Sequence, residues 1–256
     1  MIVSAQCDLR YAPFSDLQLQ RSTTGTDWLS QDELESWRTF RSDVRRNTFL
    51  AGRILAKRLL RAQHCTAWFT APSQITICSN NVSSGVRPYI KFGENRLGYS
   101  LSISHTCDAV LVGGTNRSGV SVGVDLVEMR SLSAGFERSW LTDTEIALLH
   151  KNKDHLTVAD IWAMKEAVYK AVHNGESFAP RNVEICPEPD GIIVFYRGKD
   201  ISDRCKVRVW RFRGQIAAVA TYQRLDKLPK SHFDNHDALV TIPSTSVPQT
   251  LSRNEL

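Results

Sequence analysis

The hydrophobic positions of this chain recur in short runs whose spacing predicts both helices and strands. Between residues 45 and 63 the apolar positions cover much of a helical circumference, which predicts a central core helix. Shorter runs that alternate, or that end at turn residues, predict strands. The predicted helices span residues 30–39, 45–63, 142–150 and 157–172. The predicted strands span residues 2–5, 75–78, 97–104, 109–113, 120–126, 183–186, 192–196, 207–212 and 216–222.

The order of helices followed by strands occurs twice along the chain. It predicts an α+β fold of two similar α/β halves with pseudo-twofold symmetry, each a small antiparallel sheet packed on a long helix. We expect the N-terminal half at residues 1–118 and the C-terminal half at residues 119–228. This prediction uses element order, because no residue-level repeat is apparent. Residues 229–256 are polar and contain Pro243 and Pro248, so we expect a loosely held C-terminal tail.

Composition places the chain among globular proteins. With 256 residues and 42% hydrophobic content, it can bury a substantial core. No apolar run is long enough to span a bilayer, and the first ten residues lack a signal-like apolar segment. The six cysteines have neither the spacing of a zinc site nor that of a disulfide framework. We therefore expect a cytoplasmic protein with no membrane partner.

The net charge of +5 is unevenly distributed. Between residues 38 and 61 there are eight basic residues and one acidic residue, Asp43. This segment should attract an anion, and nucleic acid, a phosphorylated cofactor and an acidic protein all qualify. An ordinary solvated basic helix face is the alternative. No nucleic-acid motif of fixed spacing occurs, so we expect no nucleic-acid partner.

The helix predicted at residues 157–172 has an unusual polar face. It begins with the capping-box spacing of Thr157 and Asp160. Its polar arc mixes two aromatic residues with a carboxylate and two ammonium groups, which favours one wall of a cleft over a solvated face. The arc contains Trp162, Lys165, Glu166, Tyr169, Lys170 and His173. An ordinary surface pair between residues four apart, worth about 0.2 to 0.5 kcal/mol, is the alternative.

Two predicted strands end in further polar groups. Ser104 and His105 close the strand at residues 97–104, where a hydrogen-bonded packing role for the histidine is the alternative to a ligand role. Asp125 follows Ser121 and Gly123 on a side of its strand that has almost no bulk. This space could accommodate a hard cation bound by the carboxylate. A structural aspartate that caps the next turn is the alternative.

Taken together, these stretches resemble the ordered motifs of the 4′-phosphopantetheinyl transferase superfamily, specifically its long, pseudodimeric surfactin-synthetase type. The resemblance runs from about residue 45 to residue 222. The matching stretches are Phe49-Leu50-Ala51-Gly52-Arg53, Arg87-Pro88-Tyr89, Ser102-Ile103-Ser104-His105-Thr106, Gly123-Val124-Asp125-Leu126, Leu141-Thr142-Asp143-Thr144-Glu145 and Trp162-x-x-Lys165-Glu166-x-x-x-Lys170-Ala171. Each motif is weak alone, but their shared order is specific.

The resemblance implies an enzyme that transfers the 4′-phosphopantetheine arm of coenzyme A to a serine of an apo acyl or peptidyl carrier protein, releasing 3′,5′-ADP. By motif position, Asp125 and Glu145 would hold Mg²⁺, while Glu166 would be a further metal ligand or, as we favour, the general base. Lys170 would stabilise the departing phosphate. The coenzyme would be bound by Arg53, Arg87, Ser104, His105, Lys165 and Lys170. We expect a monomer, because the two halves can supply both sides of one cleft.

One departure from the long-type pattern concerns the metal site. The long type has a second acid two residues after the first, but Val127 stands there and the acid, Glu128, follows it. Either a water replaces the missing ligand or the backbone bends to bring Glu128 round. This departure leaves open a coenzyme A binding homologue without transfer activity. A basic binding module for RNA or an acidic protein is a separate alternative.

Overall fold

The computed structural model describes residues 7–17, 25–63, 71–79, 88–129, 134–152, 155–173 and 176–224. The predicted strand at residues 2–5, the predicted tail at residues 229–256 and Arg87 lie outside the described residues. No described helix is both long enough and apolar enough to cross a membrane.

Five α-helices and twelve strands occur within the described residues. The helices are α1 (Gln31–Thr39), α2 (Asp43–Gln63), α3 (Ala134–Trp140), α4 (Asp143–Lys151) and α5 (Val158–Val172). The strands are β1 (Asp8–Pro13), β2 (Ile75–Cys78), β3 (Tyr89–Phe92), β4 (Asn95–Arg96), β5 (Ser100–His105), β6 (Ala109–Thr115), β7 (Val120–Glu128), β8 (Val183–Glu188), β9 (Gly191–Tyr196), β10 (Lys199–Asp200), β11 (Cys205–Phe212) and β12 (Gln215–Gln223). All four predicted helices and every predicted strand within the described residues are therefore present; β2 has the predicted bounds, and the others have shifted ends.

The strands form four antiparallel sheets of three strands each in the described part of the chain. Two have the orders β1-β6-β5 and β2-β3-β4, and the other two have the orders β7-β12-β11 and β8-β9-β10. Adding six to each strand number of the first two sheets gives the strand numbers of the other two, so the same strand arrangement occurs twice along the chain. The predicted α+β class of two similar halves is confirmed, while the boundary between residues 118 and 119 stays a prediction.

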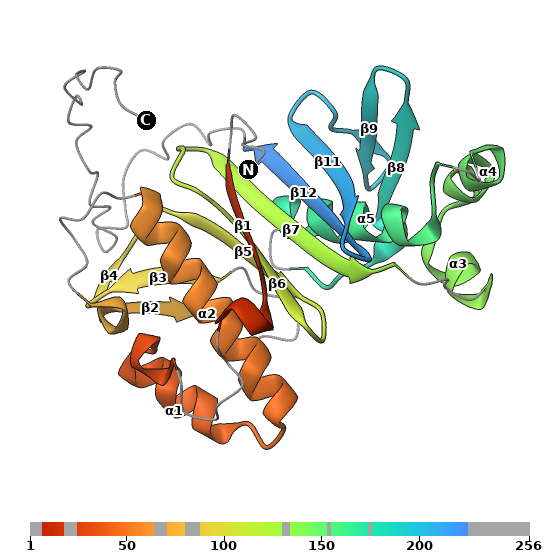
Figure 1. Cartoon of the computed structure of the whole chain (residues 1–256). Helices are drawn as coiled ribbons and strands as arrows, with labels where there is room; N and C mark the ends of the chain where they lie inside the picture. The colour runs from red at the N-terminus through yellow and green to blue at the C-terminus, as the bar shows by residue number, and fades with distance from the viewer. Residues whose placement is uncertain are drawn as a thin grey trace, which may run out of the picture.

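A long helix packs on the sheets of each half. Helix α2 contributes Ile54, Leu55 and Leu59 to a core shared with β2, β3, β5 and β6. Helix α5 contributes Met164 and Val168 to a core shared with β8, β9, β11 and β12. A third core lies between the halves, where β6, β7 and β12 meet. In Figure 1, β7 crosses the middle of the molecule, with β5 and β6 on one side and β12 and β11 on the other.

Short residue-level repeats accompany this symmetry. The sequence-based statement that no such repeat is apparent is therefore wrong. Ser30 caps α1 in a capping box with Glu33, and Thr142 caps α4 in the same way with Glu145. Both segments read Leu-Ser/Thr-x-x-Glu, at residues 29–33 and 141–145. The segments before β2 and β8 read Ala-Pro-x-x-Ile/Val-x-Ile-Cys, at residues 71–78 and 179–186. These matches are short and separated by unlike sequence, which is why element order alone reveals the duplication.

The two halves are joined by serine side chains. In β5, Ser100, Ser102 and Ser104 accept hydrogen bonds through Oγ from consecutive outward backbone N–H groups of β7. The donors are Val122 (3.0 Å), Val124 (3.0 Å) and Leu126 (3.2 Å). The opposite edge of β7 pairs with β12 in an ordinary backbone ladder. The alternation of serines seen in the sequence therefore satisfies buried backbone groups that would otherwise lack partners.

The hydrophobic pattern misses five elements. It predicts no helix or strand at residues 8–13, yet β1 lies there and pairs with β6 from Asp8↔Gly114 to Pro13↔Ala109. The pattern also gives no signal for β3, β4, β10 or α3. Strands β4 and β10 have two residues each, and α3 has seven, so none is long enough to establish a period.

Candidate active site

A cleft of about 1060 Å³ lies between the two halves. Its first wall comes from α2 and the end of β5, with Arg45, Arg53 and His105. Its second wall comes from the end of β7, from α3 and from the start of α5, where Trp162 lies. Both halves therefore line a cleft, but of the predicted polar arc of α5 only Trp162 is one of its lining residues.

A charged cluster lies where β7 and α5 meet. Lys170 Nζ lies 2.6 Å from Asp125 Oδ1 and 3.4 Å from Glu166 Oε2. The same ammonium donates to the Val124 carbonyl at 3.2 Å. Ser104 Oγ donates to Asp125 Oδ1 at 2.8 Å. The structure thus brings together Asp125, Glu166, Lys170 and Ser104 from the predicted site.

Small residues in β7 allow this arrangement. A Cβ at Gly123 would lie 2.0 Å from the Ala167 carbonyl oxygen, so only glycine permits α5 to approach so closely. Ser121 Oγ donates to the Ala171 carbonyl at 2.8 Å. The small side chains of Ser121 and Gly123 suggested space for a cation in the sequence. The backbone of α5 fills the space over these two residues. The approach places Lys170 against the carboxylate.

Burial and mutual charge shift the pKa values of this cluster. Burial raises the pKa of Glu166, and the neighbouring Asp125 adds to this effect, although Lys170 opposes it. Burial alone would lower the pKa of Lys170, but Asp125 and Glu166 outweigh it and raise that pKa. Lys170 is therefore a cation at neutral pH, and Glu166 holds its proton to a higher pH than an ordinary glutamate.

Glu145 and Lys165 do not belong to this cluster, which corrects two predicted roles. Lys165 Nζ lies 2.5 Å from Glu145 Oε2, and both side chains are fully buried. The Glu145 carboxylate also accepts from the backbone N–H of Thr142 and of Ile185. No group of three or more histidine, cysteine or acidic side chains suited to a metal occurs among the described residues. Because its oxygens are engaged in the protein interior, Glu145 is not available as a metal ligand, and Lys165 does not reach a coenzyme.

The other half contains the same buried pair. Lys57 Nζ lies 2.5 Å from Glu33 Oε2. Glu33 also accepts from the backbone N–H of Ser30 and of Ile77. Arg58 follows Lys57 where Glu166 follows Lys165, so the pair recurs without the neighbouring carboxylate, which indicates a structural role in both places. Sequence reasoning missed this pair, although the Leu-Ser/Thr-x-x-Glu repeat gave a signal for it.

Ser104 and His105, predicted together near a coenzyme phosphate, have different surroundings. Ser104 is buried between Asp125 and the Leu126 N–H, so its predicted direct contact with coenzyme is not supported. His105 lines the cleft. Partial desolvation lowers its pKa, and the nearby cations Lys170 and Arg45 lower it further. His105 is therefore a neutral imidazole at neutral pH. The charged cluster lies beside the cleft, because Leu126, next to Asp125, and Trp162, one helical turn before Glu166, both line it.

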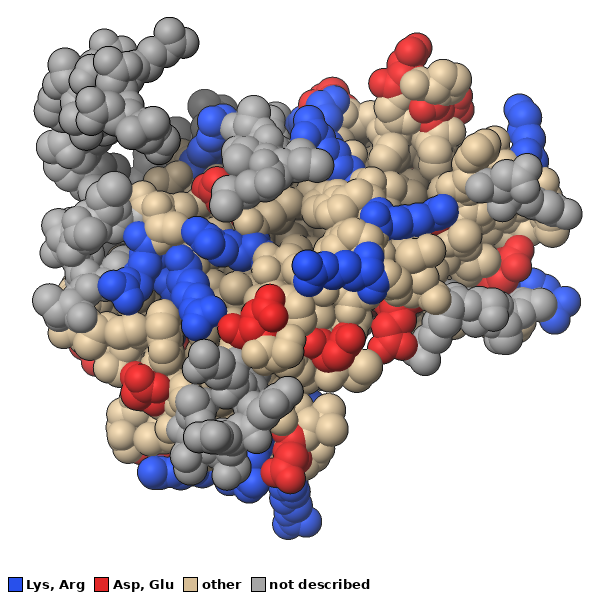
Figure 2. Space-filling view, in the orientation of Figure 1, with Lys and Arg blue, Asp and Glu red and all other residues tan. Residues whose placement is uncertain are grey.

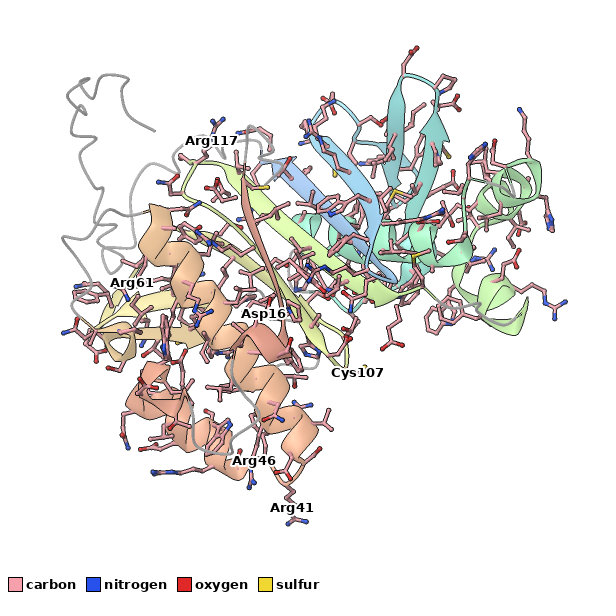
Figure 3. All side chains as sticks on the ribbon, viewed as in Figure 1. Asp16, Arg41, Arg46, Arg61, Cys107 and Arg117 are labelled. Carbon is pink, nitrogen blue, oxygen red and sulfur yellow. The ribbon has the colours of Figure 1, made fainter. Side chains whose placement is uncertain are left out.

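The basic segment at residues 38–61 is not one surface. Arg53 and Lys57 are buried. Arg41 and Arg46 lie near one end of α2, whereas Arg61 lies near the other (Figure 3). The face drawn in Figure 2 has basic and acidic side chains interspersed. Only part of the segment can therefore act on an anion in the cleft, namely Arg45 and Arg53.

Arg53 is held in place from the protein interior. Its guanidinium donates to Ser79 Oγ at 2.8 Å, lies 3.5 Å from Glu33 and stacks 4.1 Å from the centre of the Phe49 ring. Burial lowers its pKa, an effect that Glu33 opposes. Arg53 thus presents a preorganised guanidinium to the cleft.

Glu128 does not complete the charged cluster. Strand β7 pairs regularly with β12 from Val120 to Glu128, with Glu128 opposite Gln215. The backbone therefore does not bend, and Glu128 points to the opposite face of the strand from Asp125. Its carboxylate accepts from Cys107 Sγ at 3.1 Å and lines the cleft.

The aromatic members of the polar arc are packed rather than solvated. Trp162 contacts Phe136 and Phe178 edge to face, with ring centres 4.9 and 5.7 Å apart. Tyr169 is buried and stacks on Phe178 at 4.6 Å. Phe136 belongs to α3 and lines the cleft, so it is a wall residue that the sequence pattern missed together with its helix.

Part of the chain is similar in sequence to proteins of one superfamily. Residues 121–220 match the family model of the 4′-phosphopantetheinyl transferase superfamily. A holo-[acyl-carrier-protein] synthase from Mycoplasma mobile is 38% identical over 66 residues, which cover 25% of this chain and 62% of that protein. One from Caldicellulosiruptor saccharolyticus is 29% identical over 96 residues, which cover 34% of this chain and 78% of that protein. The chain thus spans less than two thirds of the length of the first relative.

Two solved structures of such synthases are also similar. The Thermotoga maritima enzyme is 24% identical, with a TM-score of 0.34, over 41% of this chain and 63% of that one. The Helicobacter pylori enzyme, in complex with coenzyme A, is 18% identical, with a TM-score of 0.31, over 39% of this chain and 96% of that one. Because both TM-scores are low, the similarity to this superfamily is carried by the sequence matches alone.

Proposed function

We propose, from the match of residues 121–220 to the family model of the 4′-phosphopantetheinyl transferase superfamily, that the protein transfers the 4′-phosphopantetheine arm of coenzyme A to a serine of an apo carrier protein. The observation that supports this most directly is the cluster of Asp125, Glu166 and Lys170 inside the matched segment, beside a cleft lined by both halves. The long surfactin-synthetase type and a cytoplasmic location stay predictions.

The cleft suits coenzyme A as the co-substrate. Coenzyme A combines an aromatic base, three phosphate groups and a mostly uncharged arm. The cleft offers Arg45, Arg53 and a histidine on one wall, and Phe136 and Trp162 on the other. We assign the 3′-phosphate to the basic wall, near Arg53 and His105. A single chain provides both walls, which supports a monomer.

A divalent cation fits the carboxylates of the cluster. Among the described residues, every hydrogen bond to Asp125 ends on Oδ1, and Glu166 is contacted only through Oε2, by Lys170. One oxygen of each carboxylate is therefore available, which suits Mg²⁺, because this ion usually keeps waters and substrate phosphates as its other ligands. We propose Asp125 as its protein ligand, and we assign Glu166 the alternative role of general base. The ion would supply Lewis acidity at the pyrophosphate.

The chain's own residues supply the remaining chemistry. The serine oxygen of the carrier forms a bond to the phosphorus that carries pantetheine, while the bond from that phosphorus to the oxygen of 3′,5′-ADP breaks. Glu166 is the general base that accepts the serine proton, consistent with its raised pKa. Lys170, cationic at neutral pH, neutralises charge on the departing phosphate.

The second substrate is an apo acyl or peptidyl carrier protein. Carriers of this kind present an acidic helix, and exposed basic residues of this chain, such as Arg41 and Arg45, are complementary to it. Such complementarity mainly accelerates association and weakens as salt screens it.

The test is a transfer assay read by mass. The full chain is incubated with coenzyme A, Mg²⁺ and each of several apo carriers, and each carrier is weighed. We expect a mass gain equal to one phosphopantetheine, abolished by EDTA and by replacing the carrier serine with alanine. Coenzyme A binding with no gain on any carrier would instead favour the binding homologue. Neither binding nor gain would favour the basic binding module.

A further inference from the structure

Ser104 differs from the two other serines that join the halves. All three accept a backbone N–H of β7 through Oγ, at 3.0, 3.0 and 3.2 Å. Only Ser104 also donates its hydroxyl hydrogen to a carboxylate, Asp125 Oδ1, at 2.8 Å. The junction between the halves therefore ends in a contact with the charged cluster, which Ser100 and Ser102 do not make within the described residues.

The two bonds of Ser104 fix the direction of its hydroxyl. A serine hydroxyl has one hydrogen to donate and two acceptor positions. The Leu126 N–H occupies an acceptor position and holds Oγ against β7, so the single hydrogen is directed at Asp125. Both groups are buried, at 8% and 5% exposure, so no bulk water competes for this hydrogen bond. The bond is charge-assisted, which makes it stronger than one between neutral groups.

The contact also determines which oxygen of Asp125 is available. Ser104 and Lys170 both bind Oδ1, the lysine at 2.6 Å. Without Ser104, Lys170 alone would hold the carboxylate, and rotation about its last torsion would be less restricted. With Ser104 present, two hydrogen bonds from different directions hold Oδ1 of Asp125. Because the carboxylate is rigid and planar, they also fix the position of Oδ2.

We propose that Ser104 is a positioning residue that orients the Asp125 carboxylate for a divalent cation and thereby couples the metal site to the junction between the halves. This inference rests on the proposed function only in assigning a cation to Asp125. It differs from the predicted role of Ser104 as a coenzyme ligand, because the serine acts through Asp125.

The experiment measures metal affinity directly. Mn²⁺ binding to the full chain, without coenzyme A, is titrated by electron paramagnetic resonance, since Mn²⁺ accepts the same oxygen ligands as Mg²⁺. The variants are Ser104→Ala, Ser102→Ala as the matched control, Ser104→Thr as the conservative variant and Asp125→Asn as the reference. Ser102→Ala removes the same type of acceptor from the same strand but touches no carboxylate.

We expect Ser104→Ala to lower Mn²⁺ affinity by about 10- to 100-fold, the usual effect of removing a partner of a metal ligand. Ser102→Ala should stay within about twofold of the wild type, although both alanine variants lose thermal stability for the same reason. Ser104→Thr, which keeps the hydroxyl, should restore most of the affinity. Equal losses in Ser104→Ala and Ser102→Ala, or no loss in Ser104→Ala, would overturn the inference.

Two further outcomes separate this inference from the proposed function. Wild-type Mn²⁺ affinity in Asp125→Asn would remove the cation from Asp125 and overturn the role of Ser104 with it. Absence of carrier modification by the wild type, with the expected order of Mn²⁺ affinities intact, would reject the transferase while leaving Ser104 as a positioning residue.

Discussion

At the scale of single residues, Glu166 has the two properties that a general base requires. It is held on a rigid helix beside Lys170, and burial raises its pKa. Glu166→Gln should therefore lower turnover by about 10²- to 10⁴-fold while coenzyme A binding stays close to that of the wild type. Turnover by carrier mass and binding by calorimetry check this, with the exposed Glu94→Gln as control. Wild-type turnover in Glu166→Gln would exclude the role.

The pH dependence gives an independent check on the same residue. A base must be deprotonated, so activity should rise with pH through the pKa of Glu166. Because that pKa is raised, the rise should lie above the range of an ordinary glutamate. The residual activity of Glu166→Gln should lack this limb, since glutamine does not titrate. A limb that persists unchanged in the variant would belong to another group.

His105 permits a second test on a single residue. If its imidazole meets the 3′-phosphate, His105→Ala should weaken coenzyme A binding by about 10-fold, the loss expected for a hydrogen bond to a charged group, and dephospho-coenzyme A much less. Competition binding of both ligands measures this, with exposed His150→Ala on α4 as control. Equal losses for the two ligands would place the 3′-phosphate elsewhere.

The sequence predicts the surroundings of some of these residues and not of others, for a physical reason. Asp125, Glu166 and Lys170 belong to elements with clear periodicity, so their faces can be predicted. The partners of Glu145 and Lys165 cannot, because a carboxylate and an ammonium are compatible with a ligand site or with a buried pair. Only the fold decides between these environments.

At the scale of elements, the contact between β7 and α5 depends on Gly123. A Cβ there would meet the Ala167 carbonyl at 2.0 Å and the Ala171 nitrogen at 2.5 Å, which are backbone atoms that cannot rotate away. Gly123→Ala should lower the free energy of unfolding by about 3 kcal/mol, the upper part of the usual range for overpacking. Urea unfolding measures this. Gly52→Ala is the control, because its Cβ would meet only the Ile103 side chain, at 3.2 Å. Equal stability of Gly123→Ala and the wild type would show that the two elements can separate at no cost.

The two buried pairs can be compared between the halves. Lys165→Met leaves the buried Glu145 carboxylate without its cation, which typically costs about 3 to 5 kcal/mol, whereas Lys57→Met leaves Glu33 with Arg53 at 3.5 Å and should cost less. Both variants should lose stability in urea unfolding, Lys165→Met the more, and under folding conditions Lys165→Met should bind coenzyme A as the wild type does. If Lys165→Met kept its stability but lost coenzyme A affinity, Lys165 would be a ligand, as the family resemblance implied.

At the scale of the whole molecule, element order was sufficient to predict two similar halves. The residue-level repeat was not recognised in the sequence, because it consists of short matches around Glu33 and Glu145 that are separated by unlike sequence. Strands β4 and β10 are too short to show a period. The junction between the halves also could not be predicted from the hydrophobic pattern. The alternation of Ser100, Ser102 and Ser104 predicts a strand face but not the neighbouring strand that its hydroxyls bind.

The junction makes a prediction about how the molecule unfolds. Ser100→Ala together with Ser102→Ala leaves the buried N–H groups of Val122 and Val124 without acceptors, each costing about 1 to 3 kcal/mol. The third core also joins the halves, since it combines Leu111 of β6 with Val124 of β7 and Val219 of β12. The halves should therefore unfold as one unit, and the double variant should lose hydrogen-exchange protection by the same factor in β6 and β12. Strand β6 pairs directly with the substituted strand β5, whereas β12 is joined to it only through β7, so an equal loss in both strands reports on global opening. Accelerated exchange confined to β6 would instead show that each half opens separately, in which case the serines would attach two independent units.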